Sequence, residues 1–345
     1  MSDKQLEFQG KDLVPPAGGQ GEEKWRRRPR KTIGEAGSRK QTLIGLVITI
    51  VLGLMFYLPV ELKQKWQEWN KEDVITIEKP IGDNRDVSEV LGFKVEIKRQ
   101  DDMLTAVNKL LEGLTGDYGI YVKQIEGNKE LKINEDKVMT AASMIKLAVL
   151  AAYYQATDQA RLDPNEIYVL DEKDRWVYGT GSMQNQPAGT KYSYQRVAFL
   201  AANESDNMGA EVLIKKLKGY KAVQTEINKW GLEKTLLKEN ETTAEETGKL
   251  LMDIFQGLLL SPASRQELLE NLTNTVLEDR ITAGVPSGVK VRHKFGSEAG
   301  VVNDCGIVEA KKAYVICVMS DNINDGEAQA VLPKISRVVW EWLGK

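Results

Sequence analysis

The tetrapeptide Ser143-Met144-Ile145-Lys146 stands at the start of the apolar run MIKLAVLAAYYQ (144–155), which the sequence predicts to form a helix. A serine at a helix N-terminus lies near free backbone N–H groups and the positive end of the helix dipole, and both stabilise a developing oxyanion. Lys146 follows one turn later on the same face, where a desolvated lysine can take the serine proton. Alone, however, Ser-x-x-Lys also fits an N-cap serine with an unrelated lysine.

Two further short motifs follow in chain order, and each also has an ordinary structural explanation. Ser-Asp-Asn at 205–207 lies in LAANESDNMGAEVLIKKL (200–217), between two helical stretches, where it can serve as a helix cap. Lys-Phe-Gly at 294–296 lies in a strand-like run, where a lysine beside a bulge glycine is common. The three motifs together therefore carry more information than any one of them.

The order of predicted elements from about residue 101 onward indicates an α+β fold. A helix precedes two strands joined by a predicted hairpin turn at 126–128; a long, mainly helical stretch follows, and then three strands and a last amphipathic helix. Strands at both ends with helices between them imply an antiparallel sheet flanked by terminal helices, beside an inserted all-helical subdomain. The predicted segments are MLTAVNKLLEGL (103–114), YGIYVKQI (118–125), KELKIN (129–134), VKVRHKFG (289–296), VNDCGIVE (302–309), AYVICVMS (313–320) and a helix over about 326–343.

In this order and on these elements, the three motifs resemble the set Ser-x-x-Lys, Ser-Asp-Asn and Lys-Thr-Gly of class A β-lactamases and penicillin-binding proteins. The resemblance extends from about residue 103 to the C-terminus and includes YGTGSM (178–183) and NETTAEETGKLL (240–251). It implies a β-lactamase/transpeptidase-like fold and a serine hydrolase that forms an acyl-enzyme with β-lactams or related amides.

Carried over onto the matching positions, the resemblance implies three catalytic residues. Ser143 attacks the carbonyl, Lys146 acts as base or proton relay, and Ser205 shuttles the proton to the leaving nitrogen. The resemblance also implies four residues in substrate binding. Asn207 holds the substrate amide and Lys146, while Lys294 supplies positive charge for the substrate carboxylate and for Ser205. Gly296 keeps the strand open to the substrate, and the backbone N–H groups of Ser297 and Ser143 form the oxyanion hole.

Phe295 departs from the family pattern, which has Thr or Ser at this position. That hydroxyl normally helps to bind the substrate carboxylate, and a hydrogen bond to a charged group is worth about 1.5–3 kcal/mol. We therefore expect weaker anion recognition and a narrower site, with Ser297 compensating in part.

A second departure concerns the water that hydrolyses the acyl-enzyme. Class A β-lactamases activate it with a glutamate in an E-x-x-L-N pattern, but the stretch WGLEKTLLKENETTAEE (230–246) contains no such pattern and looks shortened. Glu239 and Glu241 are candidates for a substitute base, although we expect both to be solvated surface carboxylates. Without a placed base, acylation can proceed while hydrolysis is slow.

The composition excludes several other chemistries. Residues 1–40 hold ten Lys and Arg against six Asp and Glu, so the rest of this chain of net charge −3 is acidic and unsuited to a nucleic-acid partner. The single histidine, His293, excludes a His-based metal site and a Ser-His-Asp triad, and we expect no metal, no cofactor and no chemical role for His293. Cys305 and Cys317 lie on neighbouring predicted strands and are expected to be buried free thiols, although a pairing stays open.

The run TLIGLVITIVLGLMFYLPV (42–60) has 19 residues without a charge and is long enough to span a bilayer. Eight basic residues precede it between 24 and 40, which argues against a buried core helix and places the N-terminus in the cytoplasm. A cleaved signal peptide fits less well because no small-x-small site follows. The predicted organisation is a disordered basic cytoplasmic tail (1–41), a transmembrane helix in contact with membrane lipid (42–60), a juxtamembrane spacer (61–100) and an extracytoplasmic hydrolase domain (101–345).

Three functions remain open from the sequence. The first is a β-lactamase-like serine hydrolase with slow deacylation, and the second is a D,D-peptidase-like penicillin-binding enzyme acting on peptidoglycan stem peptides, favoured by the membrane segment and the missing loop. The third is a non-catalytic module that binds cell-wall peptides or β-lactams. The intact catalytic set disfavours the third function, because a pure binder has no need of it.

Overall fold

The computed structural model describes residues 87–93, 97–175 and 179–345. The predicted tail (1–41), the predicted membrane segment (42–60) and most of the predicted spacer (61–100) lie outside these residues. Within them, no helix has both the length and the apolar character that a membrane span requires.

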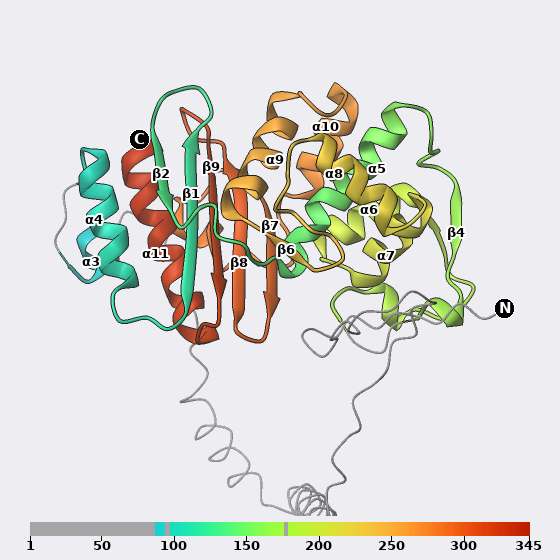
Figure 1. Ribbon diagram of the computed structural model, residues 1–345, viewed down its shortest axis with the longest axis horizontal. Coiled ribbons are helices and arrows are strands. Elements are labelled where there is room, and N and C mark those ends of the chain that lie inside the picture. Colours follow the sequence, from blue (N-terminus) through green and yellow to red (C-terminus); the bar gives the residue numbers. More distant parts are fainter. Residues whose placement is uncertain (1–86, 94–96, 176–178) are drawn as a thin grey trace, which may run out of the picture. The chain divides into compact units, whose positions relative to one another are not determined.

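Five strands form one antiparallel sheet in the order β2-β1-β9-β8-β7 (Figure 1). The pairing of β1 with β9 brings the beginning and the end of the domain together, and β7 is left at the edge beside the helical region. The predicted antiparallel sheet and its first hairpin are therefore confirmed. The strands are β1 (Asp117–Gln124), β2 (Glu130–Ile133), β7 (Val291–Glu298), β8 (Val301–Val308) and β9 (Tyr314–Asp321).

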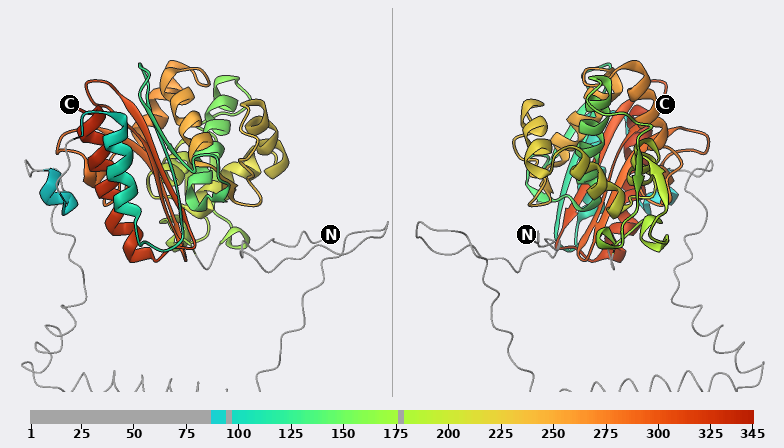
Figure 2. Two further views of the ribbon diagram at one scale, coloured as in Figure 1. Left: turned by 60° about the vertical axis from the view of Figure 1, so that its left-hand side comes forward. Right: turned by 90° about the vertical axis from the view of Figure 1, so that its right-hand side faces the viewer.

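Helices cover both faces of this sheet (Figure 2). The terminal helices α4 (Gln100–Leu111) and α11 (Asp325–Leu343) pack together on one face, with the short α3 (Val87–Leu91) against α11, while α9 (Ala244–Gln256) packs on the other. Strand β8 is covered on both sides and is buried at every position, including Asn303 and Asp304. Each fully buried Val, Leu or Ile contributes about 1.5–3 kcal/mol.

The inserted region is mainly helical but not all-helical, which corrects the prediction. Two small sheets lie within it, β3 (Met139–Thr140) with β6 (Glu241–Thr242), and β4 (Ile167–Val169) with β5 (Lys191–Ser193). These strands are too short to show a period in the sequence. The helices are α5 (Lys146–Asp158), α6 (Tyr194–Asn203), α7 (Asn207–Lys216), α8 (Tyr220–Lys229) and α10 (Pro262–Asn271), with short 3₁₀ turns η1 (Ala142–Ile145), η2 (Glu172–Asp174), η3 (Met183–Asn185) and η4 (Thr282–Gly284).

Helix α5 runs through the centre of the helical region. Ten of its residues are buried, including those on opposite faces, which matches a sequence that is apolar all round. The preceding 3₁₀ turn η1 holds Ser143 and lies between α5 and strand β7. The buried helix therefore fixes the motif serine against the edge of the sheet.

The two cysteines are joined, contrary to the expectation of free thiols. Cys305 on β8 and Cys317 on β9 are direct partners in the strand register, with their Cα atoms 4.0 Å apart, and form a disulfide. Directly opposed positions on antiparallel strands bring two side chains into contact, and both cysteines are fully buried. The sequence showed the neighbouring strands but not the register that pairs these residues.

Candidate active site

Ser143 lies where the 3₁₀ turn η1 meets the edge strand β7. Its side chain is half-buried, and the preceding Ala142 has a left-handed backbone with a φ of 48°. A Cβ atom at Gly296 would lie only 2.9 Å from the backbone nitrogen of Ser143. Glycine is therefore required at position 296 because β7 lies directly against the backbone of the nucleophile. The resemblance had implied another reason for this glycine, namely room for the substrate.

The amine of Lys146 is surrounded by oxygen atoms. Its Nζ lies 2.9 Å from Ser143 Oγ, 2.5 Å from the Ser205 carbonyl oxygen and 3.2 Å from Ser205 Oγ. The amide oxygen Oδ1 of Asn207 is also 2.5 Å away. Lys146 therefore contacts Ser143 and Ser205, the two other residues to which the resemblance gave catalytic roles, and Asn207, which it implied to hold this lysine.

Burial lowers the pKa of Lys146 to about 7, although the charge of Asp206 acts in the opposite direction. A neutral amine has two N–H donors and one lone pair. The Ser205 carbonyl and Asn207 Oδ1 can only accept hydrogen bonds, so they take both donors. The lone pair is then left for a hydroxyl group, and Ser143 provides one at hydrogen-bonding distance.

The loop that carries Ser205, Asp206 and Asn207 is stabilised by burial and by a hydrogen bond of Asp206 with the next helix. Ser205 is buried and has a left-handed φ of 56°. Asp206 caps helix α7 by accepting a hydrogen bond from the backbone N–H of Gly209 at 2.8 Å, and burial raises its pKa. The cap explanation considered for this motif is therefore correct for Asp206, while its two neighbours face Lys146.

Lys294 lies on the strand side of the site and is fully buried. Its amine donates to the carbonyl oxygen of Phe295 at 3.0 Å and sits 4.2 Å from the centre of the Phe295 ring. Burial, and to a lesser extent the positive charge of Lys146, holds the pKa of Lys294 well below its usual range. Among the hydrogen bonds of the described residues, none joins Lys294 to Ser205, the contact that the resemblance implied.

Arg280 is a residue that sequence reasoning missed. Its guanidinium is buried and donates to the carbonyl oxygens of Gly296 at 2.9 Å and Asn303 at 2.6 Å, and to Ser297 Oγ. Ser297 itself is exposed, so Arg280 brings a permanent cation to the accessible end of β7. The only signal in the sequence is a lone arginine in LEDRITAGV (277–285).

His293 has a structural environment that the sequence did not indicate. Its Nδ1 lies 2.8 Å from Asp304 Oδ1, and its Nε2 lies 3.2 Å from Glu278 Oε1 and 3.1 Å from Thr275 Oγ1. Burial by itself would lower the pKa of His293, but the carboxylates of Asp304 and Glu278 raise it to about 9. The expectation of no chemical role stays a prediction, since the imidazole tethers the 275–281 segment rather than contacting Ser143.

The shortened loop forms a tight turn. The backbones of Leu236 and Glu241 exchange two hydrogen bonds, and the carbonyl oxygen of Asn240 accepts from the N–H of Ala141, two residues before the nucleophile. Glu239 is exposed and Glu241 is half-buried. Among the described residues, no hydrogen bond or ion pair links either carboxylate to Ser143 or Lys146.

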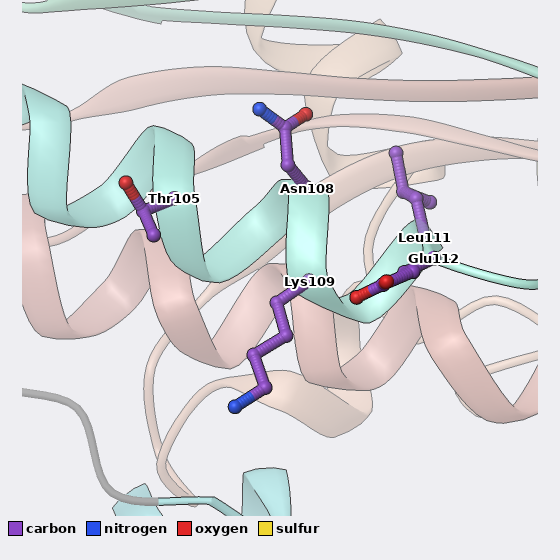
Figure 3. A pocket seen from close by; sticks show the side chains of 5 residues that line it. All are labelled: Thr105, Asn108, Lys109, Leu111 and Glu112. Atoms are coloured by element: carbon purple, nitrogen blue, oxygen red, sulfur yellow. The ribbon is translucent and has the colours of Figure 1, made fainter.

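A separate hollow on the surface is unrelated to these residues (Figure 3). It lies along helix α4, which packs on α11 across the sheet from α9. Its lining side chains are Thr105, Asn108, Lys109, Leu111 and Glu112. Within the described part of the chain, no group of three or more His, Cys, Asp or Glu side chains is arranged to hold a metal ion.

A half-buried serine beside a buried lysine, whose pKa is lowered to about 7, and beside a second serine forms a site of the kind that a serine hydrolase without a catalytic histidine requires. The chain belongs to the β-lactamase enzyme family, whose pattern matches residues 103–343. The resemblance found in the sequence is thereby confirmed.

Individual relatives are distant and match about two thirds of this chain. β-Lactamase VEB-1 of Pseudomonas aeruginosa is 20% identical over 270 residues, which are 70% of this chain and 90% of that protein. A β-lactamase of Bacillus licheniformis is 24% identical over 243 residues, 65% of this chain and 78% of that one.

Solved structures share the fold. PBP-A has a TM-score of 0.66 and 27% identity, covering 72% of this chain and 98% of its own. A PBP-A variant solved as an acyl-enzyme complex with penicillin G has a TM-score of 0.66 and 28% identity, covering 71% and 98%. The α+β architecture of an antiparallel sheet with packed helices is therefore that of this family.

Proposed function

We propose that Ser143 forms an acyl-enzyme with β-lactams or related amides and that this acyl-enzyme is hydrolysed slowly. The observation that carries the proposal is the contact between Lys146 Nζ and Ser143 Oγ at 2.9 Å, beside the Ser205 carbonyl and Asn207 Oδ1, which can only accept hydrogen bonds from that amine. A similar protein, the PBP-A variant, is known as an acyl-enzyme with penicillin G, which supports the same chemistry here.

Acylation proceeds by proton transfers between neighbouring atoms. The Ser143 hydroxyl proton moves to Lys146 Nζ as Oγ bonds to the β-lactam carbonyl carbon, giving a tetrahedral oxyanion for the backbone N–H groups of Ser143 and Ser297. The carbon–nitrogen bond then breaks, and the proton passes from Lys146 through the Ser205 hydroxyl, 3.2 Å away, to the leaving nitrogen. The product is an ester on Ser143 with the ring nitrogen protonated.

Slow hydrolysis follows from the tight turn between Leu236 and Glu241. A general base must lie within hydrogen-bonding reach of the water that it activates, directly or through one further water. The turn carries Glu239 on its exposed side, and Glu241 belongs to strand β6. Neither position supplies a carboxylate in contact with the nucleophile or with Lys146.

Substrate carboxylate recognition falls to Arg280 and Ser297. Phe295 has no hydroxyl, and the buried amine of Lys294 turns to the backbone of its own strand. Arg280 is buried and fixed by two backbone carbonyls and by Ser297 Oγ, so an anion would meet its charge next to the exposed Ser297. A guanidinium suits a carboxylate because its donors are planar and paired.

Labelling of the full-length chain with a fluorescent penicillin tests this function. The label should be covalent, should add one penicilloyl mass at Ser143, and should be absent from Ser143→Ala with an unchanged circular dichroism spectrum. Equal labelling of Ser143→Ala would exclude Ser143 as the nucleophile, and binding without a mass increase would indicate a non-catalytic module.

A peptidoglycan stem peptide is the second candidate substrate. The observation that favours it is the tight turn at 236–241, because a site that holds its acyl-enzyme for long is of little use for destroying antibiotics. Release of D-alanine from a peptide ending in D-Ala-D-Ala, dependent on Ser143, would support this substrate. A chain that is acylated by penicillin but leaves the peptide intact would argue for β-lactams alone.

The proposed location is the cell envelope. Residues 42–60 are taken to cross the membrane with the N-terminus in the cytoplasm, as the eight basic residues before Thr42 favour, and the Cys305–Cys317 disulfide suits an oxidising compartment. Protease added to spheroplasts that express the full chain should then remove the hydrolase domain and spare the tail. Protection of the domain would contradict this topology.

A further inference from the structure

The segment 179–183 lies directly against the loop that carries Ser205. The hydroxyl of Thr180 donates to the carbonyl oxygen of Ser205 at 2.6 Å, and the carbonyl oxygen of Thr180 accepts from the N–H of Asn207 at 3.0 Å. The next two residues continue the contact: the backbone N–H groups of Ser182 and Met183 donate to the carboxylates of Glu204 and Asp206 at 3.0 and 2.8 Å. Every residue from 204 to 207 is thus held by this segment.

The approach of the two segments is close enough to require glycine on either side of Thr180. A Cβ atom at Gly179 would lie 2.3 Å from the amide nitrogen of Asn207, and one at Gly181 would lie 2.1 Å from a carboxylate oxygen of Asp206. Both glycines have a positive φ, of 129° and 103°. The sequence Gly-Thr-Gly therefore places the Thr180 hydroxyl at a fixed point beside the relay.

The carbonyl oxygen of Ser205 is the atom on which two donors meet. It accepts from Thr180 Oγ1 at 2.6 Å and from Lys146 Nζ at 2.5 Å, which uses both of its lone pairs. Ser205 has a left-handed backbone, a conformation that costs free energy in a residue other than glycine and persists only when neighbouring groups hold it. Thr180 is one of those groups.

We propose that Thr180 is a positioning residue for acylation: its hydroxyl fixes the Ser205 carbonyl, and through that carbonyl it orients the Lys146 amine toward Ser143. This inference rests on the proposed acylation of Ser143. Thr180 does not itself transfer the proton, because its hydroxyl contacts the Ser205 carbonyl oxygen at 2.6 Å and Asn207 Oδ1 at 3.5 Å, and neither of these oxygens carries a proton.

The hydroxyl also affects the proton affinity of Lys146. A carbonyl that already accepts one hydrogen bond from Thr180 is a weaker acceptor for a second donor, so it stabilises the ammonium form of Lys146 less. Without the hydroxyl, the carbonyl is available to the ammonium alone and the pKa of Lys146 rises. The acid limb of the acylation rate should then move to higher pH.

The experiment compares variants of the full-length chain in their rate of acylation by a fluorescent penicillin, measured from pH 5 to pH 9. Thr180→Val removes the hydroxyl and keeps the shape of the side chain, and Thr180→Ala removes both the hydroxyl and the methyl group. Thr180→Ser keeps the hydroxyl and removes only the methyl group. Thr190→Val is the matched control, since Thr190 Oγ1 donates to the Pro187 carbonyl at 2.7 Å in the same connecting stretch, away from the relay.

We expect Thr180→Val and Thr180→Ala to be acylated about three- to tenfold more slowly than the wild type at pH 7, which is the effect of one lost hydrogen bond. The acid limb of the acylation rate should move to higher pH equally in these two variants. Thr180→Ser and Thr190→Val should match the wild-type rate and profile. Thr180 is exposed, so its three variants should fold and keep the wild-type circular dichroism spectrum.

Two results would overturn the inference while leaving acylation of Ser143 intact. One is a wild-type rate and pH profile in both variants without the hydroxyl. The other is an equal loss of rate in Thr180→Ser and Thr180→Val with an unchanged pH profile, which would indicate a packing role. Failure of the wild-type chain to be acylated at all would instead overturn the proposed function itself.

Discussion

The two walls of the site differ in how they follow the family pattern. The helical wall, formed by Ser143, Lys146, Ser205 and Asn207, has every contact that the resemblance implied for the relay. On the strand wall, formed by residues 294–297 with Arg280, a phenylalanine replaces the hydroxyl and an arginine from another segment contacts Ser297. Proton transfer depends on a few atoms at fixed distances, whereas an anion can be recognised by any cation that is placed correctly.

The two buried lysines make this difference concrete. Lys146 meets four acceptor atoms of three residues, so both its protonated and its neutral form have partners. Lys294 makes one hydrogen bond among the described residues, to the carbonyl oxygen of Phe295, and its pKa is held far below the usual range by burial. Lys146 is therefore equipped for proton transfer, while the permanent charge of the strand wall is that of Arg280.

Lys146→Met should have the largest effect, because it removes the base and keeps the volume of the side chain. We expect acylation of Ser143 to fall by about 10²–10⁴, as for a lost general base. The rate constant for labelling by a fluorescent penicillin measures this, with Lys221→Met, an exposed lysine on α8, as the control. A wild-type rate in Lys146→Met would mean that the helical wall uses another base.

Acylation should also depend strongly on pH. The pKa of Lys146 is lowered to about 7, so the neutral, proton-accepting form gains about tenfold per unit as pH rises toward 7 and becomes the major form above it. The rate should thus rise about fiftyfold from pH 5 to pH 7 and level after about a further doubling above pH 7. The same depressed pKa makes the folded state more stable as pH rises from 7 toward 10, since the unfolded chain there binds the proton more tightly. A rate that stays flat between pH 5 and pH 7 would contradict a neutral lysine base.

Arg280→Ala tests the strand wall. Loss of a charged hydrogen-bond donor should slow acylation by penicillin about 10- to 100-fold and leave a penicillin with an esterified carboxylate much less affected. Arg280→Lys should recover little, because an ammonium does not reproduce the donors that reach Gly296, Ser297 and Asn303. An equal loss for the acid and the ester would show that Arg280 only supports the strand.

The smallest effect is expected at the tight turn. Glu239→Gln and Glu241→Gln should leave the slow phase of turnover nearly unchanged after a burst of one equivalent, because neither carboxylate contacts Ser143 or Lys146. Progress curves with a chromogenic cephalosporin measure both phases. Fast steady turnover that one of these substitutions abolishes would show that a base has been relocated to this turn.

The sequence predicted the helical wall better than the strand wall for a physical reason. Ser143 and Lys146 are one helical turn apart, so their contact is local, and the apolar run that follows them fixes the helix. The sheet and the terminal helices also followed from local periodicity. The Cys305–Cys317 pair, by contrast, depends on the register of β8 against β9, and a shift of one residue would separate it.

Arg280 and His293 show the same limit. Arg280 reaches Gly296 and Asn303 only because the chain before β7 runs along the edge of the sheet, and nothing within a few residues of it specifies that path. His293 is an ordinary strand residue in the sequence, whereas its partners Asp304 and Glu278 come from β8 and from the segment before β7. Contacts of this kind belong to the tertiary fold and need the structure.

Three residues around the nucleophile, none of them glycine, have a positive φ: Ala142 at 48°, Ser205 at 56° and Asn240 at 59°. Such conformations cost about 1–3 kcal/mol each, least for asparagine, and are kept only because the surrounding fold enforces them. A separate hydrophobic core packs on each face of the sheet, and these two cores support a reactive centre that is strained. Stability and reactivity therefore compete at these three positions, and a substitution that relieves the strain at one of them is expected to stabilise the fold while loosening the relay.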